Sequence, residues 1–147
     1  MHVEESVVVD RPIDEVWAFQ TDLFNNPRLF GRGLLGIRQT SPGSLGVGST
    51  LQGRIVMLGF ETRVNFVVTE WDPPHVLALS GAFGPFRSGV ARYTFEPVGN
   101  GTKIVRSREV ELRGPLKLAS PLVTPYARRQ MRAATRQMKQ FIEGRPR

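Results

Sequence analysis

Apolar and polar side chains alternate along the middle of this chain, from about residue 33 to residue 112. In the stretch STLQGRIVML, Leu51 and Ile55 fall on one side of an extended backbone, and Gln52 and Arg54 fall on the other. A period of two residues is typical of strands with one buried face and one solvated face. Because turn residues separate several such stretches, the pattern predicts an antiparallel sheet with one face on a core.

Turn signals divide this pattern into separate strands. Pro73 and Pro74 break one run, because proline cannot donate to a sheet ladder. Asn100 followed by Gly101 is a strong signal for a two-residue hairpin, and Gly59 indicates a tight reversal. With an apolar stretch near the N-terminus included, we expect seven strands, over residues 3–9, 34–40, 49–58, 60–71, 75–81, 86–97 and 102–112.

Helices are predicted on both sides of the alternating region. Asp10 can cap a short helix over residues 11–21, and residues 25–31 predict a second short helical turn. A long helix is predicted over residues 125–143, with Thr124 as its cap and a stop at Gly144. Such a helix is roughly 28 Å long, enough to cross a small sheet.

The long helix has two chemically different sides. We expect its apolar side to face the sheet; the members are Ala127, Met131, Ala134, Met138, Phe141 and Ile142. A basic flank runs beside it, formed by Arg128, Arg132, Arg136 and Lys139. A solvated face is the simplest interpretation of this flank. The functional interpretation is attraction to anionic lipid, nucleic acid or an acidic protein.

Composition narrows the class of protein. The length of 147 residues predicts a single domain, 1–147. There is no cysteine, which excludes a disulfide framework, cysteine zinc sites and thiol nucleophiles. The net charge is +7: residues 101–147 contribute +9, from 12 Lys and Arg against 3 Asp and Glu, and residues 1–100 contribute −2. The N-terminus lacks the features of a signal peptide, so we expect a cytoplasmic protein.

Four stretches stand in a recognisable order: VVVDRPIDEVWAF (7–19), GVGSTLQGRI (46–55), VVTEWDPPHVLAL (67–79) and YTFEPVGNGTKI (93–104). Together they resemble the START-like superfamily, also called SRPBCC, which includes polyketide cyclases and the birch-pollen-allergen fold. The resemblance implies an α+β helix-grip fold: a curved antiparallel sheet of about seven strands around a long C-terminal helix, with two short helices between the first two strands. It implies less about function, because this scaffold carries many activities.

Small residues on the predicted inner walls indicate space between sheet and helix. Gly53, Gly89 and Ala91 alternate with bulkier residues, and methionine is a flexible lining for varied apolar shapes. We therefore expect a cavity of roughly a few hundred Å³, with a filled core as the alternative. The residues expected to line the cavity are Phe30, Leu51, Ile55, Met57, Val64, Phe66, Val68, Leu77, Leu79, Phe86, Ala91, Tyr93, Phe95, Arg106, Arg108, Met131, Ala134, Thr135 and Met138.

The strand period places Arg106 and Arg108 together on the inner face. Two guanidinium groups beside an apolar cavity are costly unless they are paired. With Tyr93 they are candidates for anchoring a carboxylate or phenolate, or for stabilising an enolate in catalysis. The alternative is a shifted register, or pairing of the two arginines with Glu61, Glu70 or solvent.

No cofactor or metal site is predicted. His2 and His75 have no partner at ligand spacing, and His75 is expected in a surface turn. The sequence GVG at 46–48 lacks a third glycine and precedes a strand, so it is not a dinucleotide site. We expect Trp17 and Trp71 to belong to the core rather than to a pocket.

Three classes of function remain open. The leading one is binding of a hydrophobic or amphipathic small molecule, such as a lipid, polyketide or isoprenoid, in the internal cavity. The second is a polyketide aromatase/cyclase-type enzyme, which the absence of an obvious general base weakens. A nucleic-acid or ribosome-surface binder is less favoured, because the sheet needs the apolar side of the helix. An anionic membrane surface is a compatible partner of the basic flank, and monomer and homodimer both remain open.

Overall fold

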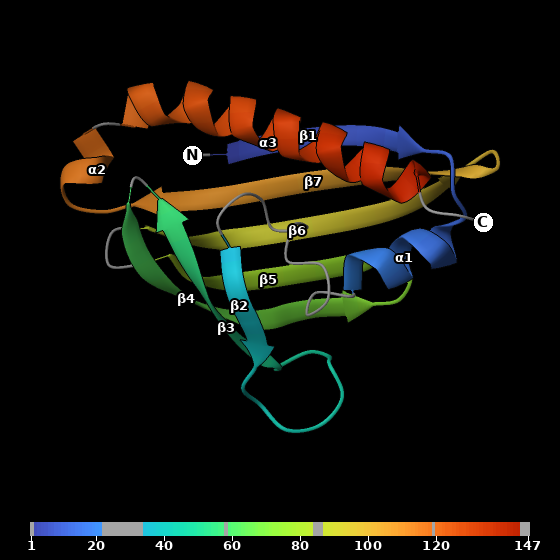
Figure 1. Ribbon diagram of the computed structural model, residues 1–147, viewed down its shortest axis with the longest axis horizontal. Helices are drawn as coiled ribbons and strands as arrows, with labels where there is room; N and C mark the ends of the chain where they lie inside the picture. The colour runs from blue at the N-terminus through green and yellow to red at the C-terminus, as the bar shows by residue number, and fades with distance from the viewer. Residues whose placement is uncertain (1, 22–33, 58, 84–86, 119, 145–147) are drawn as a thin grey trace.

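The computed structural model describes residues 2–21, 34–57, 59–83, 87–118 and 120–144 (Figure 1). Seven strands form one antiparallel sheet in the order β1-β7-β6-β5-β4-β3-β2. The strands are β1 (His2–Val9), β2 (Leu34–Gln39), β3 (Thr50–Met57), β4 (Phe60–Asp72), β5 (Val76–Phe83), β6 (Arg87–Val98) and β7 (Gly101–Leu112). The helices are α1 (Ile13–Thr21), α2 (Pro115–Leu118) and α3 (Ser120–Glu143). The predicted helix-grip fold is confirmed. The expected helical turn at residues 25–31 lies outside the described residues.

Helices α1 and α3 lie on one face of the sheet, which we call the inner face. Helix α3 runs along the sheet beside β1, and α1 packs on β6 and β7 (Figure 1). Met138 and Ile142 of α3 belong to the same buried cluster as Phe95 and Ile104 of the sheet. The core therefore lies between the helices and the inner face.

The alternating pattern predicted the inner face correctly. Its buried side chains are Val3, Val9, Leu51, Val64, Phe66, Val68, Leu77, Leu79, Tyr93, Phe95 and Ile104. The outer face carries charged side chains and two ion pairs: Arg54 of β3 with Glu61 of neighbouring β4 at 2.9 Å, and Arg92 of β6 with Glu70 of β4, across β5, at 3.1 Å. The suggested pairing of the inner arginines with these two glutamates is therefore wrong.

The start of the long helix differs from the prediction. Helix α3 begins at Ser120, so Pro125 lies inside it rather than at its first position. The chain offers two proline-based start signals, Ser120 with Pro121 and Thr124 with Pro125, and the first one starts the helix. The predicted end is right, because α3 stops at Glu143, one residue before Gly144.

The β6–β7 hairpin is also shifted by one residue from the predicted turn. Val98 pairs with Gly101, so the two turn residues are Gly99 and Asn100. Gly99 has a φ of 59°, in the left-handed region that glycine adopts without a steric penalty. The glycine before the asparagine, and not the one after it, therefore begins the turn.

The C-terminal end of α3 is fastened to the β1–α1 connection. The side chain of buried Arg11 donates through Nη2 to the carbonyl oxygen of Glu143. The backbone N–H of Asp10 donates to the Glu143 carboxylate at 2.9 Å, and Thr102 Oγ1 donates to the Arg11 carbonyl at 2.8 Å. Helix ends carry unpaired carbonyls and negative partial charge, so a cation there is favourable. These bonds hold one end of α3 against the sheet.

Two glycines allow a close approach of neighbouring strands. Gly81 of β5 and Gly89 of β6 lie opposite each other in the ladder. A Cβ at Gly81 would lie 2.0 Å from the Asn65 carbonyl oxygen, and a Cβ at Gly89 would lie 2.2 Å from that of Glu109. Both contacts are far inside van der Waals distance, so the sheet geometry at this point requires glycine.

We expect Gly81→Ala to lower the free energy of unfolding by about 2–4 kcal/mol, because backbone rather than a flexible side chain must move. Gly46→Ala is the matched control, since nothing lies within 4 Å of an added Cβ there. Its free energy should stay within about 0.5 kcal/mol of the native protein. Urea denaturation followed by circular dichroism measures both. Equal unfolding midpoints for the two variants would contradict this account of the sheet.

Candidate functional site

A charged side chain lies in the core beneath α3. Arg106 of β7 is 1% exposed, and Tyr93, directly opposite on β6, is 2% exposed. The guanidinium carbon of Arg106 lies 5.6 Å from the centroid of the Tyr93 ring. Arg108 lies two residues further along β7, opposite Ala91, and is half-buried. The predicted inward register of the two arginines is thus correct.

Helix α3 supplies one hydrogen-bond acceptor to Arg106. The Nη1 group of Arg106 donates to Thr135 Oγ1 at 3.0 Å. The Thr135 hydroxyl in turn donates to the carbonyl oxygen of Met131 at 2.7 Å. Because the threonine proton is used in that bond, its oxygen is free to accept from the guanidinium. This bond connects the middle of α3 to β7 across the core.

Other polar atoms at this point have no partner. Arg106 Nε and Tyr93 Oη form no hydrogen bond of good geometry with any described residue, although the guanidinium groups of Arg106 and Arg108 lie near the Tyr93 oxygen. No described carboxylate forms an ion pair with Arg106. Glu5, which lies opposite Arg106 on β1, pairs with Arg132 of α3 at 3.2 Å instead. The inner site therefore has an excess of positive charge.

This arrangement is unfavourable for the empty protein. Taking an ion out of water costs several kcal/mol unless a counter-charge or hydrogen bonds offset it. Each further buried polar atom without a partner costs about 1–3 kcal/mol. One neutral threonine oxygen offsets only part of this for Arg106. An anion placed against Arg106 Nε and Tyr93 Oη would supply both the missing charge and the missing acceptor.

The same electrostatics shift the pKa values of both groups. Burial lowers the pKa of Arg106, and the positive charge of Arg108 lowers it further, while Tyr93 acts in the opposite direction. Burial by itself raises the pKa of Tyr93, but the positive charges of Arg108 and Arg106, together with hydrogen bonding from their guanidinium groups, bring that pKa below its usual value. Negative charge at the Tyr93 oxygen is therefore favoured.

Most of the residues predicted to line a cavity belong to the same buried core as this pair. Fully buried among them are Leu51, Val64, Phe66, Val68, Leu77, Leu79, Phe95, Met131, Thr135 and Met138. Ala91 and Ala134 are half-buried. Phe30 and Phe86, and the side chains of Ile55 and Met57, lie outside the described part of the chain. The volume of the internal cavity stays a prediction, since part of its expected lining is among them.

Trp17 and Trp71 pack at one end of the core, as predicted. Their rings meet edge to face at 5.2 Å between centroids, and Trp17 also meets Phe95 at 5.6 Å. Both indoles are half-buried against the main cluster. Their fluorescence is therefore suited to reporting changes in the core.

Gln20 of α1 is another buried polar side chain, and the sequence did not predict its burial. It is 1% exposed, and neither atom of its amide group has a hydrogen-bond partner in the described ranges. Gln20 follows Val16 by one helical turn, so it shares the buried side of α1. This spacing from Val16 was the sequence signal that could have placed Gln20 in the core. Unused hydrogen-bonding atoms in the core are therefore not confined to Arg106 and Tyr93.

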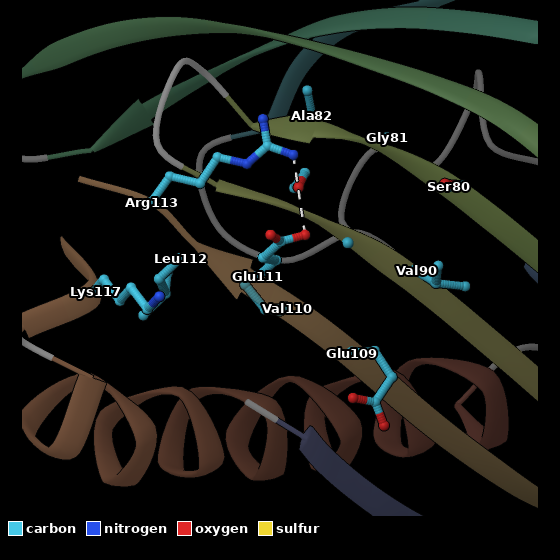
Figure 2. A pocket seen from close by; sticks show the side chains of 12 residues that line it. Ser80, Gly81, Ala82, Val90, Glu109, Val110, Glu111, Leu112, Arg113 and Lys117 are labelled. Atoms are coloured by element: carbon cyan, nitrogen blue, oxygen red, sulfur yellow. Dashed lines mark ion pairs between the residues drawn. The ribbon is translucent and has the colours of Figure 1, made fainter.

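An open groove of about 870 Å³ lies elsewhere, on the outer side of β5, β6 and β7 (Figure 2). Its lining comes from Ser80, Gly81, Ala82, Ser88, Gly89, Val90, Glu109, Val110, Glu111, Leu112, Arg113 and Lys117. Glu111 and Arg113 point toward each other there and form an ion pair at 3.9 Å (Figure 2). None of the residues predicted to bind ligand lines this groove, so it is not the predicted cavity.

Metal ligands do not gather in the described ranges: no three His, Asp or Glu side chains lie close enough to hold an ion. His75 is exposed at the turn before β5, as predicted. Among the described helices, none combines the length and apolarity needed to cross a membrane.

The fold is similar to several solved structures. The Zhui aromatase/cyclase from Streptomyces sp. R1128 matches with a TM-score of 0.81 and 17% identity, over 100% of this chain and 96% of that one. A protein of Thermus thermophilus, TTHA0849, matches with a TM-score of 0.77 and 19% identity, over 97% of both chains. Ara h 8.0201 matches with a TM-score of 0.72 and 14% identity, over 99% of both. At such identities the likeness shows the fold alone.

Sequence comparison gives a closer relation. An uncharacterized protein of Mycobacterium tuberculosis is 33% identical over 109 residues, which cover 74% of this chain and 73% of that protein. The model of the family described as polyketide cyclase / dehydrase and lipid transport matches residues 1–143. These matches confirm the START-like resemblance. The chain belongs to the polyketide cyclase/dehydrase and lipid transport family.

Proposed function

We propose that this protein binds a small amphipathic molecule between the inner face of the sheet and α3. The ligand has an apolar body and an acidic head group, and the head group contacts Arg106. The observation that carries the proposal is a buried guanidinium that forms no ion pair with the described carboxylates. Membership of a family that includes lipid transport supports binding of a molecule of this class.

The site offers complementary partners for a carboxylate. Arg106 Nε and the Tyr93 hydroxyl both have an unused donor, and a carboxylate accepts several hydrogen bonds at once. Charge-assisted hydrogen bonds to a guanidinium are about twice as strong as neutral ones. Half-buried Arg108 adds positive charge from the next inward position of β7. An acid is thus favoured here over a neutral molecule of the same shape.

The apolar body would lie among the side chains around this pair. Leu77 and Leu79 of the sheet and Met131 and Met138 of α3 are buried in the same layer. Removing apolar ligand surface from water contributes about 25 cal/mol per Å². This term supplies affinity, and the arginine selects the head group.

We expect acidic probes to bind more tightly than neutral ones of the same shape. The probe pairs are palmitate with hexadecanol, and naphthoic acid with its methyl ester, so that both a chain and a fused-ring body are tested. Arg106→Gln should remove a preference of roughly 10- to 100-fold, the size expected for hydrogen bonds to a charged group. Fluorescence of Trp17 and Trp71 reports binding in each case.

Arg92→Gln is the matched control, since Arg92 lies on the outer face and pairs with Glu70. It should bind every probe as the native protein does. If no probe of either shape binds, the binding function itself is wrong. If acid and neutral probes bind alike, and Arg106→Gln changes nothing, the binding function stands but the acidic head group is excluded.

A second candidate, a cyclase-type enzyme, is favoured by one observation. The lowered pKa of Tyr93 increases the fraction of phenolate at a given pH, and the phenolate is the form that can accept a proton. That supplies a candidate for the general base which the sequence did not reveal. Arg106 and Arg108 would then stabilise the enolate that forms when Tyr93 removes a proton next to a carbonyl group. Both candidates place a negative charge at the same point.

The affinity for an acidic probe should fall as pH rises through the pKa of Tyr93. Above that pKa the phenolate supplies negative charge beside Arg106 and repels a second anion. Because the pKa of Tyr93 is lowered, the fall should begin below the usual value of about 10. By linkage, a bound acid should raise the pKa of Tyr93, which phenolate absorbance measures.

Tyr93→Phe should abolish this alkaline loss of affinity, while Tyr126→Phe, at an exposed position on α3, should keep it. An unchanged pH profile in Tyr93→Phe would show that Tyr93 does not face the bound head group.

A further inference from the structure

Large apolar side chains are exposed where α2 meets the start of α3. Leu118 is 88% exposed, Leu122 is 81% exposed and Tyr126 is 56% exposed. Helices α2 and α3 contact each other at one end of the molecule (Figure 1). It is the end of the sheet at which β7 finishes and β6 begins, because Leu112 pairs with Arg87. We call these three side chains the apolar tip.

The apolar tip continues into a basic row on the same side of α3. Leu122, Arg129 and Arg136 follow one another at intervals of seven residues, so they share one side of the helix. That side lies opposite Met131 and Met138, which are buried against the sheet. The solvent side of α3 is therefore apolar at its start and basic further along.

No acidic residue lies between Glu111 and Glu143, while this segment holds seven Lys and Arg. Among the residues that the structure describes, two of the seven form an ion pair: Arg113 with Glu111, and Arg132 with Glu5. Arg132 remains exposed in this pair, as expected for the predicted basic flank. Arg128, Arg129 and Arg136 are exposed and form no ion pair with the described residues. They give the surface around the apolar tip a strong positive charge.

We propose that this end of the molecule docks on an anionic lipid surface, with the apolar tip entering the interface and Arg128, Arg129 and Arg136 contacting lipid phosphates. Interfacial helices combine these two features: apolar side chains enter the headgroup region, and cations are drawn to anionic lipid. The docking surface lies outside the core and does not depend on the ligand site.

Other partners fit these observations less well. A second copy of the chain would bring two strongly positive surfaces together. A nucleic acid would engage the arginines, but it offers no apolar surface to cover two exposed leucines. A lipid surface satisfies the charge and the apolar side chains together.

Co-sedimentation with vesicles tests the docking. The vesicles are pure phosphatidylcholine, or phosphatidylcholine with about 30% phosphatidylglycerol as the anionic lipid. We expect binding only to the anionic vesicles. The double substitution Leu118→Gln with Leu122→Gln should weaken it roughly tenfold or more, through lost apolar burial. Replacing Arg128, Arg129 and Arg136 by Gln should weaken it about 100-fold, because each cation near such a surface contributes roughly a factor of five.

Matched controls come from the outer face of the sheet. Val90→Gln removes an exposed apolar side chain there, and Arg63→Gln removes an exposed cation. Both should bind vesicles as the native protein does, and circular dichroism verifies that every variant is folded.

Three results would overturn the proposal. One is a lack of binding to anionic vesicles. Another is a concentration-dependent dimer in solution that the leucine substitutions abolish, which would assign the tip to a second copy. The third is vesicle binding that depends on the arginines but not on the leucines, since no side chain would then enter the lipid.

Discussion

The burial of one guanidinium inside an apolar core is the constraint on which the other features of the site depend. Arg106 lies on the inner face because β7 alternates, and the alternation cannot turn one side chain outward without moving Ile104 as well. A charge held there needs partners. The described chain supplies a single threonine oxygen and the face of Tyr93, and it directs Glu5 to Arg132 instead. The unmet need for negative charge is what makes this point the proposed binding site.

The fold keeps this point beneath α3 by contacts at the C-terminal end and in the middle of that helix. Arg11 and Asp10 bind Glu143 and fasten the C-terminal end of α3, while Thr135 meets Arg106 in the middle of the helix. Gly81 and Gly89 let the strands on the opposite side approach closely. Contacts at the C-terminal end of α3 and the Thr135 bond within the site therefore hold α3 across the site. The first turns of the same helix expose apolar and basic side chains to solvent.

Local patterns in the sequence predict the sheet well. A period of two residues was enough to place Tyr93 and Arg106 on one face, because each strand has only two faces. The hydrogen bond from Arg106 to Thr135 was beyond prediction, since it depends on the height and rotation of α3 over β7. The pairing of Glu5 with Arg132 joins residues 127 positions apart and depends on the same placement. Ser120 and Thr124 are both good helix caps, so the true start of α3 needed the structure. The residues of the candidate site were visible in the sequence, and their partners were not.

The most direct test is the free energy of unfolding of Arg106→Met, measured by urea denaturation of the ligand-free protein and again with palmitate present. If Arg106 is an unpaired buried charge, the substitution should leave the ligand-free protein as stable as the native one or more stable, by up to about 4 kcal/mol. Palmitate should then stabilise the native protein but much less so the variant. A ligand-free variant destabilised by about 3–5 kcal/mol would show that the protein itself satisfies the guanidinium, as breaking a completed buried pair does. That result would contradict the proposed anchor for an acidic ligand.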